Sequence, residues 1–91
     1  MDQTTRDDTV HRMKTIAGHM NGIVRMLEED RYCIDVIKQI QAIQTALARV
    51  SEEILDSHLK TCVTTAVQGS DPNERERVLN EITEVFRYTH R

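Results

Sequence analysis

Two cysteines and one histidine of this 91-residue chain could together hold a metal ion. Cys33 lies near the start of a long helical stretch, and His58 and Cys62 lie near its end. His58 and Cys62 are four residues apart, so on a helix their side chains point the same way. Two thiolates and an imidazole form a soft ligand set, which favours Cu(I) and Zn(II) over hard cations. Three ligands suit Cu(I), whereas Zn(II) would take a fourth from His11, His19 or water.

The element that must position these ligands runs from residue 31 to residue 67. It contains no Gly and no Pro, and its apolar residues recur every three or four positions, which predicts one long helix. Cys33 and His58 are 25 residues apart, which at about 1.5 Å per residue separates them by roughly 37 Å. They therefore cannot meet within one chain. The predicted apolar stripe consists of Val36, Ile40, Ile43, Leu47, Val50 and Ile54.

A second copy of the helix would solve this separation. If two copies run antiparallel and cross near Ala46 and Leu47, Cys33 of one chain lies beside His58 and Cys62 of the other. The pair would then hold two equivalent Cys–His–Cys sites across a two-fold axis, as an isologous dimer requires. The thiols must lose their protons on binding, so metal affinity should rise with pH across the mildly acidic range.

Each of the three residues also has a plainer interpretation. Cysteines on a bundle helix are often small buried apolar residues, and a histidine near a helix end is often a surface residue. Spacing alone leaves the two interpretations open. The sequence has no Gly-rich phosphate loop, no Ser/His/Asp set and no recognisable pair of catalytic carboxylates. We therefore expect neither an enzyme nor a small-molecule substrate.

Length and charge restrict the class of protein further. Ninety-one residues make one small domain, residues 1–91, with residues 1–6 expected to be disordered. The formal net charge of −3 weighs against nucleic-acid binding, although the distribution of charge matters more than its sum. No apolar run approaches the length of a membrane span, and the acidic N-terminus is unlike a signal peptide. A cytoplasmic location with reduced thiols is expected.

Two shorter helices should flank the long one. The first should start near Asp7 or Asp8 and end before the charged segment 28–31, in which Asp30 is a candidate N-cap for the long helix. The long helix should end near Gly69, in a left-handed C′ conformation. The last helix should start with Asp71 as N-cap, Pro72 at the first helical position and Glu74 at the third.

The sequence also resembles a known family. The run HRMKTIAGHMNGIVRMLEEDRYCIDVIKQI at residues 11–40, followed by ALARV and SHLKTCV, is similar to the CsoR/RcnR family of metal-sensing bacterial repressors over residues 8–67. The resemblance implies an all-α fold with three helices per chain. It also implies an antiparallel dimeric four-helix bundle and a dimer of dimers. Members of the family repress transcription and release operator DNA when the inducer binds.

The resemblance also implies which residues act. Copper sensors of the family use Cys, His and Cys, which match Cys33, His58 and Cys62 and imply Cu(I) as the ligand. Tyr32 and Glu81 match residues that support these ligands in the copper sensors. The residues that match the family's DNA-contacting positions are Arg12, Lys14 and Arg49, and Arg25 and Arg31 add charge.

Other functions remain open at this point. A repressor of the same family could respond to nickel, cobalt or a thiol-reactive inducer. A metal-buffering protein with no DNA role belongs to a different class.

Overall fold

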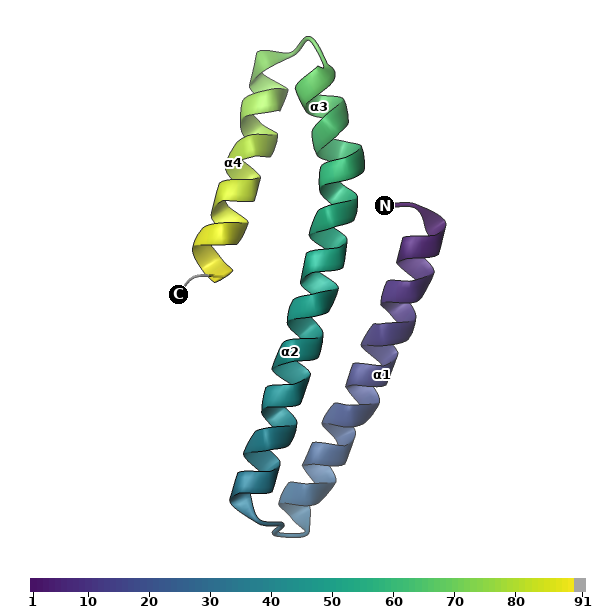
Figure 1. Cartoon of the computed structure of the whole chain (residues 1–91), viewed down its shortest axis with the longest axis vertical. Helices are drawn as coiled ribbons and strands as arrows, with labels where there is room; N and C mark the ends of the chain where they lie inside the picture. The colour runs from purple at the N-terminus through teal and green to yellow at the C-terminus, as the bar shows by residue number, and fades with distance from the viewer. Residues whose placement is uncertain (90–91) are drawn as a thin grey trace. The chain divides into compact units, whose positions relative to one another are not determined.

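The computed structural model describes residues 1–89, and every regular element in that range is a helix (Figure 1). α1 spans Gln3–Glu28, α2 spans Cys33–His58, the π-helical turn η1 spans Leu59–Val63, α3 spans Thr64–Gln68 and α4 spans Pro72–Thr89. α2, η1 and α3 follow one another without a loop, which confirms the all-α class and the three helical segments predicted. No described helix is long and apolar enough to cross a membrane.

The chain divides into two compact units, Met1–Leu55 and Asp56–Arg91. The first unit contains α1 and most of α2, and the second contains the last turn of α2, η1, α3 and α4. The assignment of residues 1–91 to a single domain stays a prediction.

The first unit is a helical hairpin with a core that repeats every seven residues. α1 buries Ile16 and Ile23, and α2 buries Val36, Ile43 and Val50. Seven residues make nearly two helical turns, so each series forms one line along its helix, as in a coiled coil. Met26, Ala46 and Leu47 pack against this core and are partly buried.

α1 begins earlier than predicted. It starts at Gln3 rather than at Asp7 or Asp8, so residues 3–6 belong to a helix and the prediction of disorder across residues 1–6 is wrong for them. Asp2 occupies the N-cap position, where a negative charge is favourable beside the helix N-terminus. The Thr5 hydroxyl donates a hydrogen bond that lowers the pKa of the Asp2 carboxyl.

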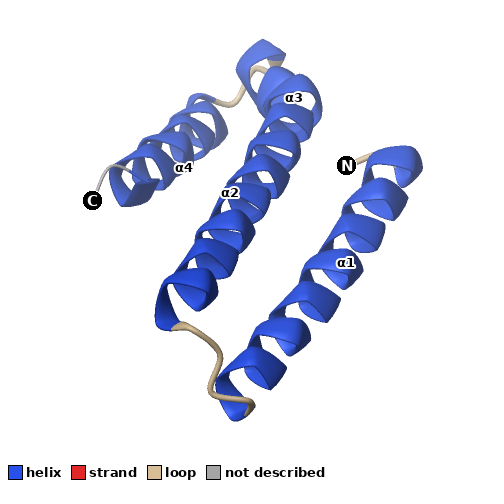
Figure 2. Ribbon diagram, turned by 60° about the horizontal axis from the view of Figure 1, so that its bottom comes forward, coloured by secondary structure: helices blue, strands red, loops and turns tan. Residues whose placement is uncertain are grey.

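The turn between α1 and α2 corrects the role of Asp30 (Figure 2). Asp30 does not cap α2. It adopts a left-handed conformation with φ of 54°, just after the end of α1. Its N–H donates to Leu27 O at 3.1 Å, and the Arg31 N–H donates to Met26 O at 2.9 Å. These two bonds form a Schellman motif, in which Asp30 takes the position usually held by glycine.

The second unit contains a widened helical turn, η1. The hydroxyl of Thr64, the first residue of α3, donates to Leu59 O of η1 at 2.7 Å, five residues back. The Thr61 and Thr65 hydroxyls donate to carbonyls four residues back, each at 2.8 Å. Such bonds satisfy carbonyl groups that a π-helical turn leaves poorly paired. Val63 of η1 is buried, as is Val78 on α4.

The last helix starts as predicted. Asp71 Oδ1 accepts hydrogen bonds from the backbone N–H groups of Asn73 at 3.0 Å and Glu74 at 3.4 Å, with Pro72 at the first helical position. Gly69, however, has φ of −73° and ψ of 170°, so the predicted left-handed conformation is wrong. α3 ends instead in extended backbone.

The left-handed turn generates a stability prediction. We expect Asp30→Gly to raise the free energy of unfolding by about 0.5–1 kcal/mol, because glycine removes the steric cost of positive φ and loses part of that gain to chain entropy. Glu29→Gly is the matched control, since Glu29 has a φ of −85° and gains nothing from glycine. Chemical denaturation followed by circular dichroism, at one protein concentration, measures both. A less stable Asp30→Gly variant would contradict the interpretation.

Candidate metal centre and basic groove

The three predicted metal ligands lie at the two ends of α2 and just beyond it. Cys33 is the first residue of α2, His58 is its last, and Cys62 lies in η1. Both thiols are free and exposed, and His58 is partly buried. Within residues 1–89, no three His, Cys, Asp or Glu side chains lie close enough together to hold a metal ion. The described part of one chain therefore does not contain an assembled metal site.

The π-helical turn around Cys62 was not predicted from the sequence. A π-helix holds more residues per turn than an α-helix, and such turns occur frequently at functional sites. At four residues' separation, His58 and Cys62 still lie on the same side of the helix. The Thr61 hydroxyl is 3.7 Å from Cys62 Sγ and 2.8 Å from Ser57 O. The sequence did hold a signal, because the β-branched residues of TCVTTAV at 61–67 disfavour a regular α-helix.

The two predicted supporting residues, Tyr32 and Glu81, have different surroundings. Tyr32 precedes α2, its side chain is exposed, and its carbonyl accepts a hydrogen bond from the Val36 N–H at 3.2 Å. Glu81 lies on α4 and pairs with Arg77 at 2.5 Å. Arg77 also pairs with Glu74, one turn earlier on α4. The supporting roles of Tyr32 and Glu81 stay predictions.

The two histidines named as alternative ligands both lie on α1. His19 Nε2 is 2.6 Å from Gln39 Oε1 of α2, so the ring donates from this nitrogen and only Nδ1 is left to bind a metal ion. His11 is exposed, and its carbonyl accepts a hydrogen bond from the Thr15 hydroxyl at 3.1 Å. A fourth ligand from His19 would therefore have to use Nδ1 or break the bond to Gln39.

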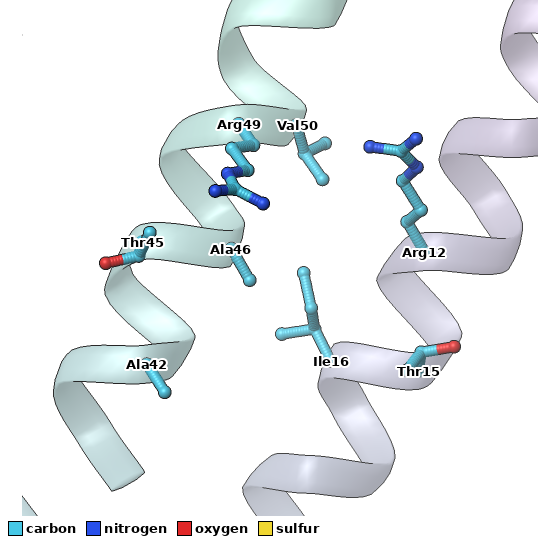
Figure 3. A pocket seen from close by; sticks show the side chains of 8 residues that line it. All are labelled: Arg12, Thr15, Ile16, Ala42, Thr45, Ala46, Arg49 and Val50. Carbon is cyan, nitrogen blue, oxygen red and sulfur yellow. The ribbon is translucent and has the colours of Figure 1, made fainter. Parts of the chain in front are cut away.

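Two of the three predicted DNA-contacting residues line one groove between α1 and α2 (Figure 3). Arg12 extends from α1 toward α2, and Arg49 lies on the opposite wall. The groove has a volume of about 520 Å³. Lys14 is not in its lining, because a residue two positions from Arg12 points to another side of the helix. The remaining lining residues are Thr15, Ile16, Ala42, Thr45, Ala46 and Val50.

Sequence reasoning missed two features of this groove. Ala42 and Ala46 leave space between the helices. Two small residues four positions apart, followed by the basic Arg49, could have indicated a groove from the sequence. Arg12 also forms an ion pair with Glu53 of α2, which is 41 residues away in the sequence. No sequence pattern indicated that partner.

A family model and individual relatives agree on the class of protein. Residues 5–88 match the model described as metal-sensitive transcriptional repressor. This chain belongs to that family, which confirms the resemblance read from residues 8–67.

One curated relative is the copper-sensing transcriptional repressor CsoR of Mycobacterium tuberculosis. It is 42% identical over 80 residues, which cover 88% of this chain and 65% of the relative. This chain thus spans about 65% of the length of such relatives.

Two solved structures extend the comparison. The copper-sensing repressor CsoR with Cu(I) from Geobacillus thermodenitrificans is similar with a TM-score of 0.88 and 32% identity, covering 100% of this chain and 92% of that chain. The nickel-responsive transcriptional regulator InrS is similar with a TM-score of 0.71 and 34% identity, and the match covers 90% of this chain and 89% of that chain. The shared fold therefore does not by itself fix the inducer.

Arg77 on α4 affects how the stability of the fold depends on pH. Hydrogen bonding to Arg77 holds the pKa of Glu74 below its ordinary value. Because that pKa is lowered in the folded protein, the pair stabilises the fold above the ordinary glutamate pKa. This contribution is lost as the pH falls through the lowered pKa.

We expect Arg77→Gln to raise the pKa of Glu74 toward the ordinary range, as measured by NMR titration of the carboxyl carbon. Arg75→Gln is the control, because the Arg75 guanidinium donates to Gly69 O at 2.8 Å. A Glu74 pKa that moves equally in both variants would argue against a specific pair.

Proposed function

We propose that this protein is a copper(I)-responsive transcriptional repressor of the cytoplasm. In this proposal it binds operator DNA without copper and releases it when Cu(I) binds an intersubunit site made of Cys33, His58 and Cys62. Release of the operator would allow expression of copper efflux or resistance genes. The observation that carries the proposal is the soft donor set at the two ends of α2, in a chain of the metal-sensitive repressor family.

An exposed apolar line on α2 supports an antiparallel dimer. Cys33, Ile40, Leu47 and Ile54 follow one another every seven residues, so they share one side of the helix, and Leu47 is the member of this line that is partly buried against the hairpin core. Ile40 and Ile54 are 41% and 38% exposed, whereas the line Val36, Ile43 and Val50 is already buried against α1. A second α2, running antiparallel, would cover the exposed line. It would bring its own His58 and Cys62 toward Cys33.

The chemistry of the donor set suits the metal. Both thiols are exposed and free, so both are accessible to a soft ion, which binds such groups as thiolates. Bound Cu(I) would be held by Cys33 of one chain and by His58 and Cys62 of the other, with no hard oxygen ligand needed. Tyr32 and Glu81 are proposed to support these ligands from outside, as such partners commonly do.

The proposed DNA contacts are cationic residues on α1 and α2. Arg12 and Arg49 at the groove, with Lys14 nearby, would bind phosphates and make operator binding depend strongly on salt. The net charge of −3 does not prevent this, because local potential rather than total charge steers a polyanion. A tetramer made of two dimers would carry four copies of this cationic surface, one from each chain.

Metal and DNA are proposed to act through one allosteric equilibrium. Copper would stabilise a dimer geometry that binds the operator poorly. Such coupling is reciprocal, so the DNA-bound protein must bind Cu(I) more weakly than the free protein.

Cu(I) is expected to be the inducer that releases the protein from DNA. In an anaerobic titration followed by fluorescence anisotropy on the DNA upstream of its own gene, Cu(I) should release the protein at about one ion per chain. His58→Ala should abolish release, and His11→Ala should leave it intact. Release by Ni(II) or by a thiol-reactive compound instead of Cu(I) would identify another inducer. Cu(I) binding without any DNA binding would favour a metal-buffering protein.

Because the proposed site lies between two chains, two defective variants should complement each other in a mixed dimer. Cys33→Ala and Cys62→Ala proteins should each lose tight Cu(I) binding. When the two are unfolded together and refolded, a mixed dimer keeps one intact site, so tight binding should return in about half of the dimers. Mixing Cys33→Ala with the double variant Cys33→Ala/Cys62→Ala leaves no intact site and is the matched control. No recovery in the first mixture would exclude the antiparallel arrangement.

A further inference from the structure

Arg12 is not a free cation at the edge of the groove. Its guanidinium pairs with the Glu53 carboxylate, which joins α1 to α2. The two side chains are 51% and 39% exposed, so solvent and salt reach the pair. An exposed pair of this kind contributes little to stability and opens readily. Glu53 therefore influences the charge that Arg12 presents at the surface more than it influences the fold.

The other polar groups of the groove do not compensate for this carboxylate. The Thr15 hydroxyl donates to His11 O at 3.1 Å, and the Thr45 hydroxyl donates to Gln41 O at 3.2 Å. Figure 3 shows both hydroxyls pointing away from the space between the helices. Binding of an anion here therefore falls to the guanidinium groups. Within residues 1–89, Arg49 has no ion pair, although it lies one turn before Glu53 on α2, so the direct contact of the Glu53 carboxylate is with Arg12.

We propose that Glu53 is an internal competitor of DNA phosphate for Arg12 and so limits the operator affinity of the repressor. This inference rests on the proposed function and deepens it. A phosphate that binds Arg12 must replace the carboxylate, and the displaced carboxylate then repels the phosphate or takes up a cation from solution. Both effects reduce the gain in affinity that Arg12 would otherwise provide. They also reduce the dependence of binding on salt.

Glu52 provides a matched comparison. It is the adjacent residue on α2, it is exposed, and its substitution by glutamine changes the net charge by the same amount. It does not belong to the ion pair with Arg12. General electrostatic repulsion predicts the same effect for Glu52 and Glu53, whereas competition for Arg12 predicts a larger effect for Glu53.

The test compares Glu53→Gln with Glu52→Gln on upstream DNA by fluorescence anisotropy at several salt concentrations. We expect Glu53→Gln to bind about three- to ten-fold more tightly than the wild type, with a steeper fall of log K with log salt, because no cation is taken up at residue 53. Glu52→Gln should change both quantities much less. In an Arg12→Gln background, Glu53→Gln should increase the affinity for DNA by no more than Glu52→Gln does.

Two results would overturn the proposal. One is an equal gain from the two glutamate variants, which would reduce the effect to net charge. The other is a full Glu53→Gln gain that persists without Arg12. If the wild type binds no DNA, the proposed function fails separately. The pair is then tested on heparin, where later elution of Glu53→Gln than of Glu52→Gln supports competition for Arg12 and equal elution refutes it.

Discussion

The packing of α1 against α2 is the contact on which the first unit depends. Ile16 and Ile23 pack with Val36, Ile43 and Val50 in lines that repeat every seven residues. Because α2 can pack α1 along only one of its sides, this contact also decides which residues remain on the other side. The hairpin core therefore determines the surface on which any second chain could pack.

In the proposed dimer, the side of α2 that α1 leaves uncovered is the side on which chain association and metal binding meet. The exposed line that contains Ile40 and Ile54 begins at Cys33. An antiparallel partner that buried this line would bring soft ligands from two chains together at each end. Association and metal binding would then be thermodynamically linked, since each would favour the same geometry. A site divided between chains is well suited to sensing, because its occupation changes how the chains are arranged.

The charged residues are unevenly distributed over the surface of the first unit. The protein is acidic overall, yet Arg12 and Arg49 share the edge of one groove between the two helices. Glu53 lies on α2, as Arg49 does, and it forms an ion pair with Arg12 of α1. A repressor must release its operator, so the strongest possible affinity for DNA is no advantage. In the proposed repressor, a carboxylate that competes within the chain would keep the affinity for DNA within a range that Cu(I) binding could overcome.

The sequence by itself determined the helical class, the extent of the long helix and the Asp71 N-cap of α4, and it supplied the proposed soft donor set. These depend on local periodicity, capping and residue type. It did not determine the left-handed Asp30, the π-helical turn at Cys62 or the pairing of Arg12 with Glu53. It also merged two apolar lines of α2 into one stripe. The spacing of apolar residues shows which side of a helix is apolar but not what packs against it. Only the packed hairpin distinguishes the buried line that contains Val36 from the exposed line that contains Ile40.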